Sequence, residues 1–431
     1  MAKAAAVSIG QSGARALTPC GKIRYLMQNV QCATPGSAAT DKLVQATPAD
    51  QARERIARAM PGLDGIRGIA VLLVMIHHAI SAGSIQAGGP ISSVILKLGK
   101  AGWIGVDFFF VLSGFLITGS LFRERGQRHY FRNFYGRRVL RIFPLYFIFL
   151  ICTFLLLAPQ LASWYGPAYD ELKANQWWFW SSLQNLYLAK IGGTVLPVGQ
   201  LWSLAVEEQF YFFWPLILLA FPIRRILNGA IGICLVEIVL RAILVERGWT
   251  EEAIYISSLT RLDSLLIGGA LAIYLMTADS IPALKRVVAV GLTFIVLALG
   301  CEVILDRGFR RDGMALQTFG LTTFACIGAL AIFSSISQNN NAVLNRLLSV
   351  RWLRLTGRYS YSMYLFHPPI FAGVRWAFGH WGLMLGSGPI SWITATFALI
   401  GFICSYLAGG ITWRLIEQPI LKWRRYFRGT Q

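Results

Sequence analysis

An arginine and two histidines stand in one apolar stretch, "LDGIRGIAVLLVMIHH", which runs from Leu63 to His78. An α-helix turns by about 100° per residue, so Arg67 and His78 lie almost three turns apart on one face, roughly 16 Å along the axis. His77 points about 80° away from that face. Ionisable groups in an apolar segment are costly and usually mark function. The stretch therefore predicts a site with Arg67 near the membrane surface and His78 deep.

A carboxylate stands in the next apolar stretch, "GWIGVDFFFVLSGFLITG". Asp107 has two open interpretations, since a carboxylate here can hold a histidine in one tautomer or can pair with an arginine. Gly114 lies seven residues on and on the same face, where it lets a helix or a ligand approach closely. Ser113 offers a hydrogen-bond partner.

The most basic segment follows, "RERGQRHYFRNFYGRRVLRIFPLY". Arg138 and Arg141 are three residues apart and Arg137 and Arg141 are four apart, so we expect one cluster on a helix. Guanidinium groups in such a cluster suit bidentate binding of phosphate. The predicted ligand is a polyphosphate, and lipid headgroups are the competing one.

Polar groups recur in later apolar stretches. Glu207 and Glu208 are adjacent in "LWSLAVEEQFYFFWP", so only one of them is expected to face a given cavity. Arg261 and Asp263 are candidates for an internal ion pair. His367 precedes two prolines in "SYSMYLFHPP", which predicts an irregular backbone that lines a cavity.

The composition of the chain indicates that these polar side chains are carried by transmembrane helices. The 431 residues are 55% hydrophobic and 14% charged, with a mean hydropathy of +0.54, which predicts an all-α, polytopic integral membrane protein. Apolar runs of span length predict about ten transmembrane helices, at residues 66–84, 103–122, 140–158, 201–222, 227–245, 254–276, 284–304, 314–334, 359–378 and 390–413. The aromatic stretch 177–188 is too short to span and is predicted to be interfacial or re-entrant.

The distribution of basic residues predicts the orientation. With the N terminus inside, 28 of the 40 Lys and Arg fall in inside segments and 8 in outside loops, so we expect both termini in the cytoplasm. Because the basic residues lie between apolar runs, nucleic-acid binding is not expected. The seven cysteines show no CxxC spacing, and neither a disulfide framework nor a metal site is indicated.

The residues before the first apolar run differ from the rest. Residues 1–60 are rich in Ala, Gln, Thr, Pro and Gly and predict a disordered or weakly helical cytoplasmic tail. Met60 stands immediately before the first motif, which leaves two hypotheses for the residues before it. Either Met60 is the physiological start, or the upstream segment is a genuine regulatory tail. The remaining predicted parts are a transmembrane domain over residues 61–425 and a cytoplasmic end over residues 426–431.

Six motifs in order resemble the membrane-bound acyltransferase 3 family. They are "LDGIRGIAVLLVMIHH", "GVDFFFVLSGFLIT", "RRVLRIFPLY", "LWSLAVEEQFYFFWP", "SYSMYLFHPP" and "RLIEQPILKW". The resemblance implies a catalytic pair at Arg67 and His78, a donor-binding motif at Arg138 and Arg141, and a functional carboxylate at Glu207. His77 departs from the family pattern, and a swap of roles between the two histidines stays open. The extracytoplasmic hydrolase-like domain that some members carry is not expected in this chain.

The resemblance implies an O-acyltransferase of the bacterial inner membrane. The expected donor is acyl-CoA, acetyl-CoA above all, as a co-substrate with no permanently bound cofactor, and the expected acceptor is an extracytoplasmic sugar, polysaccharide precursor or lipid-linked sugar. Arg137, Arg138 and Arg141 are expected to bind the donor, with His78 as general base or acyl carrier. Asp107 or Glu207 would orient His78. The alternative function is a transporter or flippase of a lipid-linked sugar.

Overall fold

The computed structural model describes residues 48–85, 89–193, 197–277, 284–305, 313–336, 342–383, 385 and 391–427. These residues belong to one compact unit, Thr47–Gln431, and all their regular elements are helical. The predicted tail lies outside the described residues up to residue 47, and the chain is helical from Pro48 on. Residues 428–431 of the predicted C-terminal end also lie outside them.

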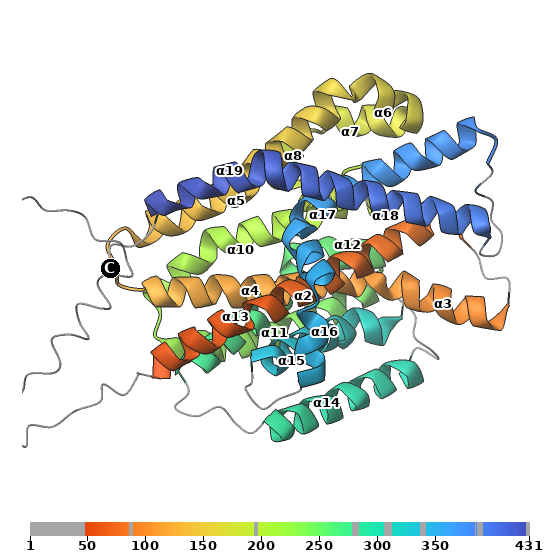
Figure 1. Ribbon diagram of the computed structural model, residues 1–431. Coiled ribbons are helices and arrows are strands. Elements are labelled where there is room, and N and C mark those ends of the chain that lie inside the picture. Colours follow the sequence, from red (N-terminus) through yellow and green to blue (C-terminus); the bar gives the residue numbers. More distant parts are fainter. Residues whose placement is uncertain are drawn as a thin grey trace, which may run out of the picture. The chain divides into compact units, whose positions relative to one another are not determined.

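Long helices make up most of this unit (Figure 1). They are α2 (Pro48–Ala82), α3 (Pro90–Lys100), α4 (Gly105–Glu124), α5 (Tyr130–Ile151), α10 (Leu201–Ala220), α11 (Ile223–Glu246), α13 (Leu262–Thr277), α14 (Leu284–Leu305), α15 (Leu321–Ile336), α17 (Arg351–His380) and α18 (Trp392–Thr412). Short helices connect them: α6 (Ala158–Tyr165), α7 (Pro167–Ala174), α8 (Trp177–Trp180), α9 (Gln184–Lys190), α12 (Glu251–Ile256), α16 (Ala342–Leu348) and α19 (Gln418–Leu421). The predicted all-α class is confirmed.

Six helical segments of the described chain are long and apolar enough to cross a membrane. They are Met60–Ala82, Ser92–Glu124, Tyr130–Leu156, Ile223–Glu246, Leu316–Ile336 and Trp392–Phe427, and each overlaps a predicted span. Leu262–Thr277 and Ala289–Glu302 are apolar but shorter. These segments make the chain a multi-pass membrane protein, and the count of about ten is not confirmed.

Local sequence explains three of the predicted spans that are not among the six. The run 254–276 breaks after α12, and only Leu262–Thr277 continues as an apolar helix. The helices α10 and α17 cover the predicted spans 201–222 and 359–378, but they carry polar groups, Glu207 and Glu208 in the first and His367 in the second. Side chains that serve a polar interior lower the hydropathy of the helix that carries them.

Glycines bring the central helices into backbone contact. A Cβ atom on Gly114 of α4 would lie 1.9 Å from the carbonyl oxygen of Leu265 in α13, so only glycine fits there. The predicted close approach at Gly114 is therefore confirmed, and the partner is a helix. A Cβ atom on Gly357 of α17 would lie 1.8 Å from the carbonyl oxygen of Asp64 in α2. These two pairs, α4 with α13 and α2 with α17, place the helices that carry the polar groups side by side.

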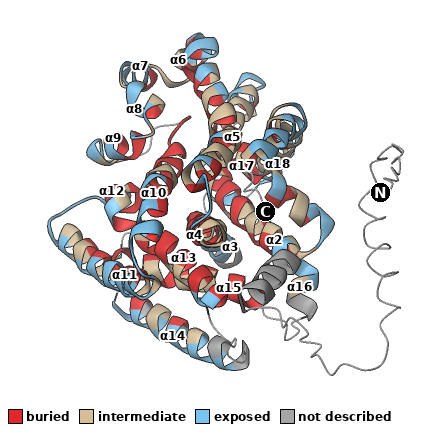
Figure 2. Ribbon diagram, turned by 90° about the vertical axis from the view of Figure 1, so that its left-hand side faces the viewer, coloured by how far each residue is buried: buried red, intermediate tan, exposed pale blue. Residues whose placement is uncertain are grey.

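Burial separates the inner helices from the outer ones. Buried residues gather on α4, α10 and α13, whereas α11 and α14 expose much of their surface (Figure 2). The exposed residues of these outer helices are largely apolar, and include Ile231, Leu235, Val236, Val290 and Leu297. Large exposed apolar faces are unfavourable in water and are satisfied by hydrocarbon, as expected for a membrane protein.

Candidate functional site

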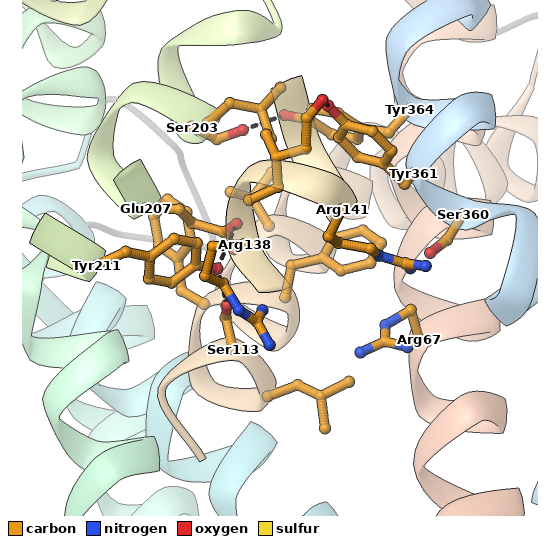
Figure 3. Close-up of a pocket in the computed structure, with 16 residues that line it drawn as sticks. Arg67, Ser113, Arg138, Arg141, Ser203, Glu207, Tyr211, Ser360, Tyr361 and Tyr364 are labelled. Atoms are coloured by element: carbon orange, nitrogen blue, oxygen red, sulfur yellow. Dashed lines mark hydrogen bonds between the residues drawn. The ribbon is translucent and has the colours of Figure 1, made fainter. Parts of the chain in front are cut away.

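Three arginines and a glutamate line a narrow cavity of about 120 Å³, here called the arginine cavity. The charged residues are Arg67 of α2, Arg138 and Arg141 of α5, and Glu207 of α10. In Figure 3 the guanidinium groups of Arg67 and Arg138 face each other across the space, and Arg141 lies beside them. The rest of the lining is hydroxyl, aromatic and aliphatic: Val106, Phe109, Phe110, Leu112, Ser113, Ile142, Ser203, Leu204, Tyr211, Ser360, Tyr361 and Tyr364.

Aromatic rings and carboxylates position the guanidinium groups. Arg138 lies over the ring of Tyr211, 5.8 Å from the ring centroid, and Arg141 lies over Trp413 at 6.0 Å. Arg141 also pairs with the buried Glu417 at 3.7 Å, and Arg67 pairs with Asp64 at 3.5 Å. An arginine that stacks on a ring keeps its in-plane N–H groups available for an anion. The cavity thus gathers three guanidinium groups that neighbouring rings and carboxylates already hold in place.

Arg137 does not join this cluster. Its Nη2 donates to both carboxylate oxygens of Glu124, at 2.6 and 2.7 Å, and its Nη1 donates to the carbonyl oxygen of Phe427 at 2.7 Å. The expected cluster of three arginines on α5 is therefore wrong for Arg137. Helix geometry alone does not exclude Arg137, which points only about 40° away from Arg141. The ion pair with Glu124 of α4 is what holds its guanidinium group outside the cavity.

Glu207 sits at the end of a hydrogen-bonded chain within the arginine cavity. Tyr211 donates its hydroxyl to Glu207 Oε2 at 2.9 Å and also shares a hydrogen bond with Ser113 (Figure 3). Glu208, next in sequence, is not among the residues that line the cavity, in agreement with the expectation that only one of the two faces it. His78 lines a different cavity, and the predicted role of Glu207 in orienting His78 stays a prediction.

Asp107 is fully buried and pairs with an arginine. Arg261 donates from Nη2 to Asp107 Oδ1 at 2.5 Å, and Ser264 donates its hydroxyl to the same oxygen at 3.2 Å. Of the two interpretations left open for Asp107, the structure shows the arginine pair. The expected pair of Arg261 with Asp263 is wrong, since Asp263 accepts from Arg241 at 2.9 Å. Residues two positions apart on a helix do not face each other, so each finds its partner on another element.

The second cavity, of about 690 Å³, is here called the His78 cavity. Its lining comes from α2, α6 and α17: His78, Ser81, Ala82, Ser163, Trp164, Tyr165, Pro368, Phe371, Ala372, Arg375, Trp376, Gly379 and His380. The ring of Trp376 stacks on His380 with centroids 5.5 Å apart, and it lies 6.0 Å from the ring of Trp164. An apolar, aromatic cavity with a few polar groups is the usual form of a small-molecule site.

Two polar groups in this cavity's wall are available to a ligand. Within the described chain, the buried Nε1 of Trp164 and the buried hydroxyl of Tyr165 have no hydrogen-bond partner. Burial raises the pKa of the Tyr165 hydroxyl to about 12, so this group stays protonated at neutral pH and can donate. Both groups are therefore donors that a bound acceptor oxygen would satisfy.

The two adjacent histidines take different directions. His78 Nδ1 lies 2.9 Å from the carbonyl oxygen of Val74, one turn back, and His77 Nδ1 lies 2.7 Å from the carbonyl oxygen of Lys100 at the end of α3. Since a carbonyl oxygen only accepts, Nδ1 carries the proton in both rings and Nε2 carries the lone pair. His78 lines the His78 cavity, whereas His77 is hydrogen-bonded to the end of α3. This agrees with the expected separation of the two side chains.

His367 packs against His78 without lining either cavity. The ring centroids lie 4.7 Å apart with the planes at 80°, and His367 is fully buried. The ring of Tyr364, which lines the arginine cavity, lies 5.8 Å from the His367 ring. His367 thus contacts a residue of one cavity and a residue of the other.

The expected irregular backbone at His367 is wrong, because α17 continues through Pro368 and Pro369. Proline has no N–H, so these two residues leave the carbonyl oxygens four positions back, on Tyr364 and Leu365, without their helical donors. Side chains take their place. His367 Nδ1 donates to the Tyr364 oxygen at 2.9 Å, and Gln200 Nε2 donates to the Leu365 oxygen at 2.9 Å. The helix stays regular because each lost hydrogen bond is replaced.

Two further residues of the quoted motifs lie at this site, although no role was predicted for them. Glu417 of "RLIEQPILKW" holds Arg141 and accepts a hydrogen bond from Ser362, and Tyr364 of "SYSMYLFHPP" borders the arginine cavity. The buried carboxylate in an apolar run was the available signal for Glu417. Nothing in the spacing indicated Tyr364, since its place depends on how α17 packs against α10.

Comparison with known proteins relates this chain to acyltransferases. The model of an acyltransferase domain matches residues 60–414. The chain is 28% identical over 386 residues to peptidoglycan O-acetyltransferase OatA of Listeria monocytogenes, covering 86% of this chain and 57% of that protein. It is 30% identical over 329 residues to putative peptidoglycan O-acetyltransferase YrhL of Bacillus subtilis, covering 73% and 49%.

O-acetyltransferase OatA of Staphylococcus aureus is 29% identical over 383 residues, which cover 85% of this chain and 58% of that protein. The chain thus spans about half to three fifths of the length of these curated relatives. No solved structure matches significantly.

Proposed function

We propose, since this chain belongs to the membrane-bound acyltransferase 3 family, that it is an integral membrane O-acyltransferase. It moves an acyl group, acetyl as the first expectation, from cytoplasmic acyl-CoA to a hydroxyl of an extracytoplasmic sugar or polysaccharide precursor. One observation carries the proposal: α2 and α17 together border two cavities, one cationic and one aromatic with a histidine in its wall.

The arginine cavity suits the donor. Coenzyme A carries phosphate groups, and Arg138 and Arg141 offer planar guanidinium groups held by stacking and by Glu417. Arg67, Arg138 and Arg141 supply the charge, and Arg137 acts indirectly by fixing Glu124. The aromatic residues Phe109 and Tyr364 of the lining would contact the pantetheine arm, which would carry the thioester toward His78.

The His78 cavity suits the acceptor. Its volume lies in the range of sites for small molecules. The rings of Trp164 and Trp376 offer apolar faces to the C–H groups of a sugar, and Trp164 Nε1 and Tyr165 Oη offer donors to its oxygens. The printed names of the relatives make peptidoglycan the first acceptor to test.

In this proposal the two substrates meet at His78, which lines the acceptor cavity. With Nδ1 bonded to the carbonyl of Val74, its Nε2 lone pair can take the proton of an acceptor hydroxyl. The hydroxyl oxygen then attacks the thioester carbonyl carbon, and the C–S bond breaks. The same nitrogen can instead attack the thioester first and carry the acyl group on His78, so direct transfer and an acyl-histidine relay remain the two forms of the proposal.

The proposed orientation is supported by the basic residues around the arginine cavity. Arg138 and Arg141 continue the basic run that begins at Arg123, and the charge distribution favours that run on the cytoplasmic side. The arginine cavity would then open toward cytoplasmic acyl-CoA, with the His78 cavity toward the outside.

A transfer assay tests the proposal. Purified protein in liposomes is given acetyl-CoA labelled in the acetyl group together with peptidoglycan fragments, and labelled fragments are expected. Movement of a lipid-linked sugar across the bilayer without any labelled acetyl product would instead support the transporter or flippase. Protein carrying His78→Ala serves as the matched inactive control, since it tests whether any transfer comes from the proposed site.

A further inference from the structure

We propose that His367 is a proton relay that accepts the proton His78 takes from the acceptor hydroxyl and passes it toward the arginine cavity. This inference rests on the proposed acyl transfer. His367 takes the proton from His78 and gives it to the leaving thiolate, and four observations support this role.

The first observation is its place. The His367 ring packs edge to face against His78, which borders the acceptor cavity, and beside Tyr364, which borders the donor cavity. Among the described residues, no other histidine is fully buried. His367 therefore contacts one residue of each cavity.

The second observation is its tautomer. His367 Nδ1 lies 2.9 Å from the carbonyl oxygen of Tyr364 and 3.1 Å from that of Met363. Both oxygens can only accept, so the proton of the neutral ring sits on Nδ1 and Nε2 carries a lone pair. Pro368 reinforces this choice, because it cannot donate to the Tyr364 oxygen and leaves that acceptor to the imidazole.

The third observation is the state of Nε2. This nitrogen is buried and has no hydrogen-bond partner in the part of the chain that the structure describes. A buried acceptor that stays unpaired carries a cost in stability and calls for an explanation. A nitrogen that receives a proton during each turnover provides one.

The fourth observation is the proton balance that two separate cavities impose. The acceptor O–H bond breaks, its oxygen bonds to the acyl carbon, and the thioester C–S bond breaks to leave the coenzyme A thiolate. The proton starts in the His78 cavity, and it ends on the sulfur of a donor whose phosphate groups are held in the arginine cavity. Transfer from His78 Nε2 to His367 Nε2, and from there to the thiolate, closes this balance without a further reactant. This balance describes direct transfer, in which His78 Nε2 is free of the acyl group when it takes the acceptor proton.

The test uses two substitutions of His367 in the full-length protein. His367→Asn keeps an N–H near the Tyr364 carbonyl and removes Nε2, whereas His367→Phe keeps the ring and removes both nitrogens. His129→Asn is the matched control, since His129 is exposed, has φ 67° and lies where asparagine is well tolerated. Steady-state kinetics with acetyl-CoA and acceptor are measured in H2O and D2O.

We expect both His367 variants to lose about 10²-fold or more in kcat, with KM for both substrates near the wild-type value. The solvent isotope effect on kcat should increase, because proton transfer becomes rate-limiting. A kcat within about twofold of wild type in either folded variant overturns the proposal. So does a loss of kcat with an unchanged isotope effect, which would assign His367 to packing. Absence of transfer by the wild-type protein would instead refute the proposed function itself.

Discussion

His367 donates its Nδ1 proton to the carbonyl oxygen of Tyr364, at 2.9 Å, within a single uninterrupted helix. In an ordinary helix that oxygen accepts from the backbone N–H four residues on, but position 368 is proline. The Pro–Pro pair thus does not break α17. It makes one carbonyl available to the imidazole and another, on Leu365, available to Gln200.

Pro368→Ala tests this relationship. The new N–H would compete with His367 for the Tyr364 oxygen and loosen the imidazole, so kcat should fall by roughly 10- to 100-fold, less than on removal of the ring. The folded protein should be at least as stable as wild type, because a helical hydrogen bond is gained. Thermal unfolding and steady-state kinetics give the two readouts.

Pro369→Ala is the matched control for that experiment. Its new N–H reaches Leu365, whose oxygen is held by Gln200, so kcat should change little. Equal changes in kcat from the two substitutions would contradict the claim that Pro368 sets the tautomer of His367 by leaving the Tyr364 oxygen free.

Substitutions at Arg138 and Arg141 test the donor site. Alanine removes a charge-assisted hydrogen bond and should raise KM for acyl-CoA by roughly 10- to 100-fold. Lysine keeps the charge but loses the bidentate geometry, so an intermediate value is expected. Arg128→Ala, on an exposed loop, is the control and should behave as wild type. Wild-type KM values in all four donor-site variants would leave the cluster with a role in lipid binding or anchoring.

His78→Ala and His77→Ala form a matched pair. Loss of the His78 imidazole should lower the rate by about 10²–10⁴-fold or more, with normal expression and membrane insertion. His77→Ala should lower the rate less, since the His77 ring is hydrogen-bonded to the Lys100 carbonyl and does not line the His78 cavity. The assignment fails if the His77 variant is inactive while the His78 variant transfers at the wild-type rate.

Asp107→Ala tests whether this carboxylate is structural. It would leave Arg261 buried without its ion-pair partner, which typically costs about 3–5 kcal/mol, so the melting temperature in detergent should fall sharply. Asp170→Ala, at an exposed position of α7, is the control. A variant that keeps its melting temperature and loses all transfer would instead place Asp107 in the chemistry.

Trp376→Ala tests the acceptor cavity. Loss of an aromatic face should raise KM for the sugar acceptor by roughly tenfold, while KM for acyl-CoA stays at the wild-type value. Trp392→Ala removes an exposed tryptophan at the start of α18 and provides the control. If the KM for acyl-CoA rises instead, the His78 cavity binds the donor, and its assignment to the acceptor is wrong.

The sequence alone determined the relations within single helices. Arg67 and His78 share a face because they are eleven residues apart, and Arg138 and Arg141 share one because they are three apart. Six ordered motifs also indicated the family, which the matched domain confirms. These features depend on spacing and residue type, and both are written in the chain.

Only the tertiary structure decided which groups meet across helices. The pairing of Asp107 with Arg261, the exclusion of Arg137 and the contact of His78 with His367 each depend on which helix lies opposite. That choice comes from close packing at glycines such as Gly114, and a periodic pattern on one helix does not specify its neighbour. The prolines of α17 show the same limit, because their effect depended on Gln200, which α17 itself does not contain.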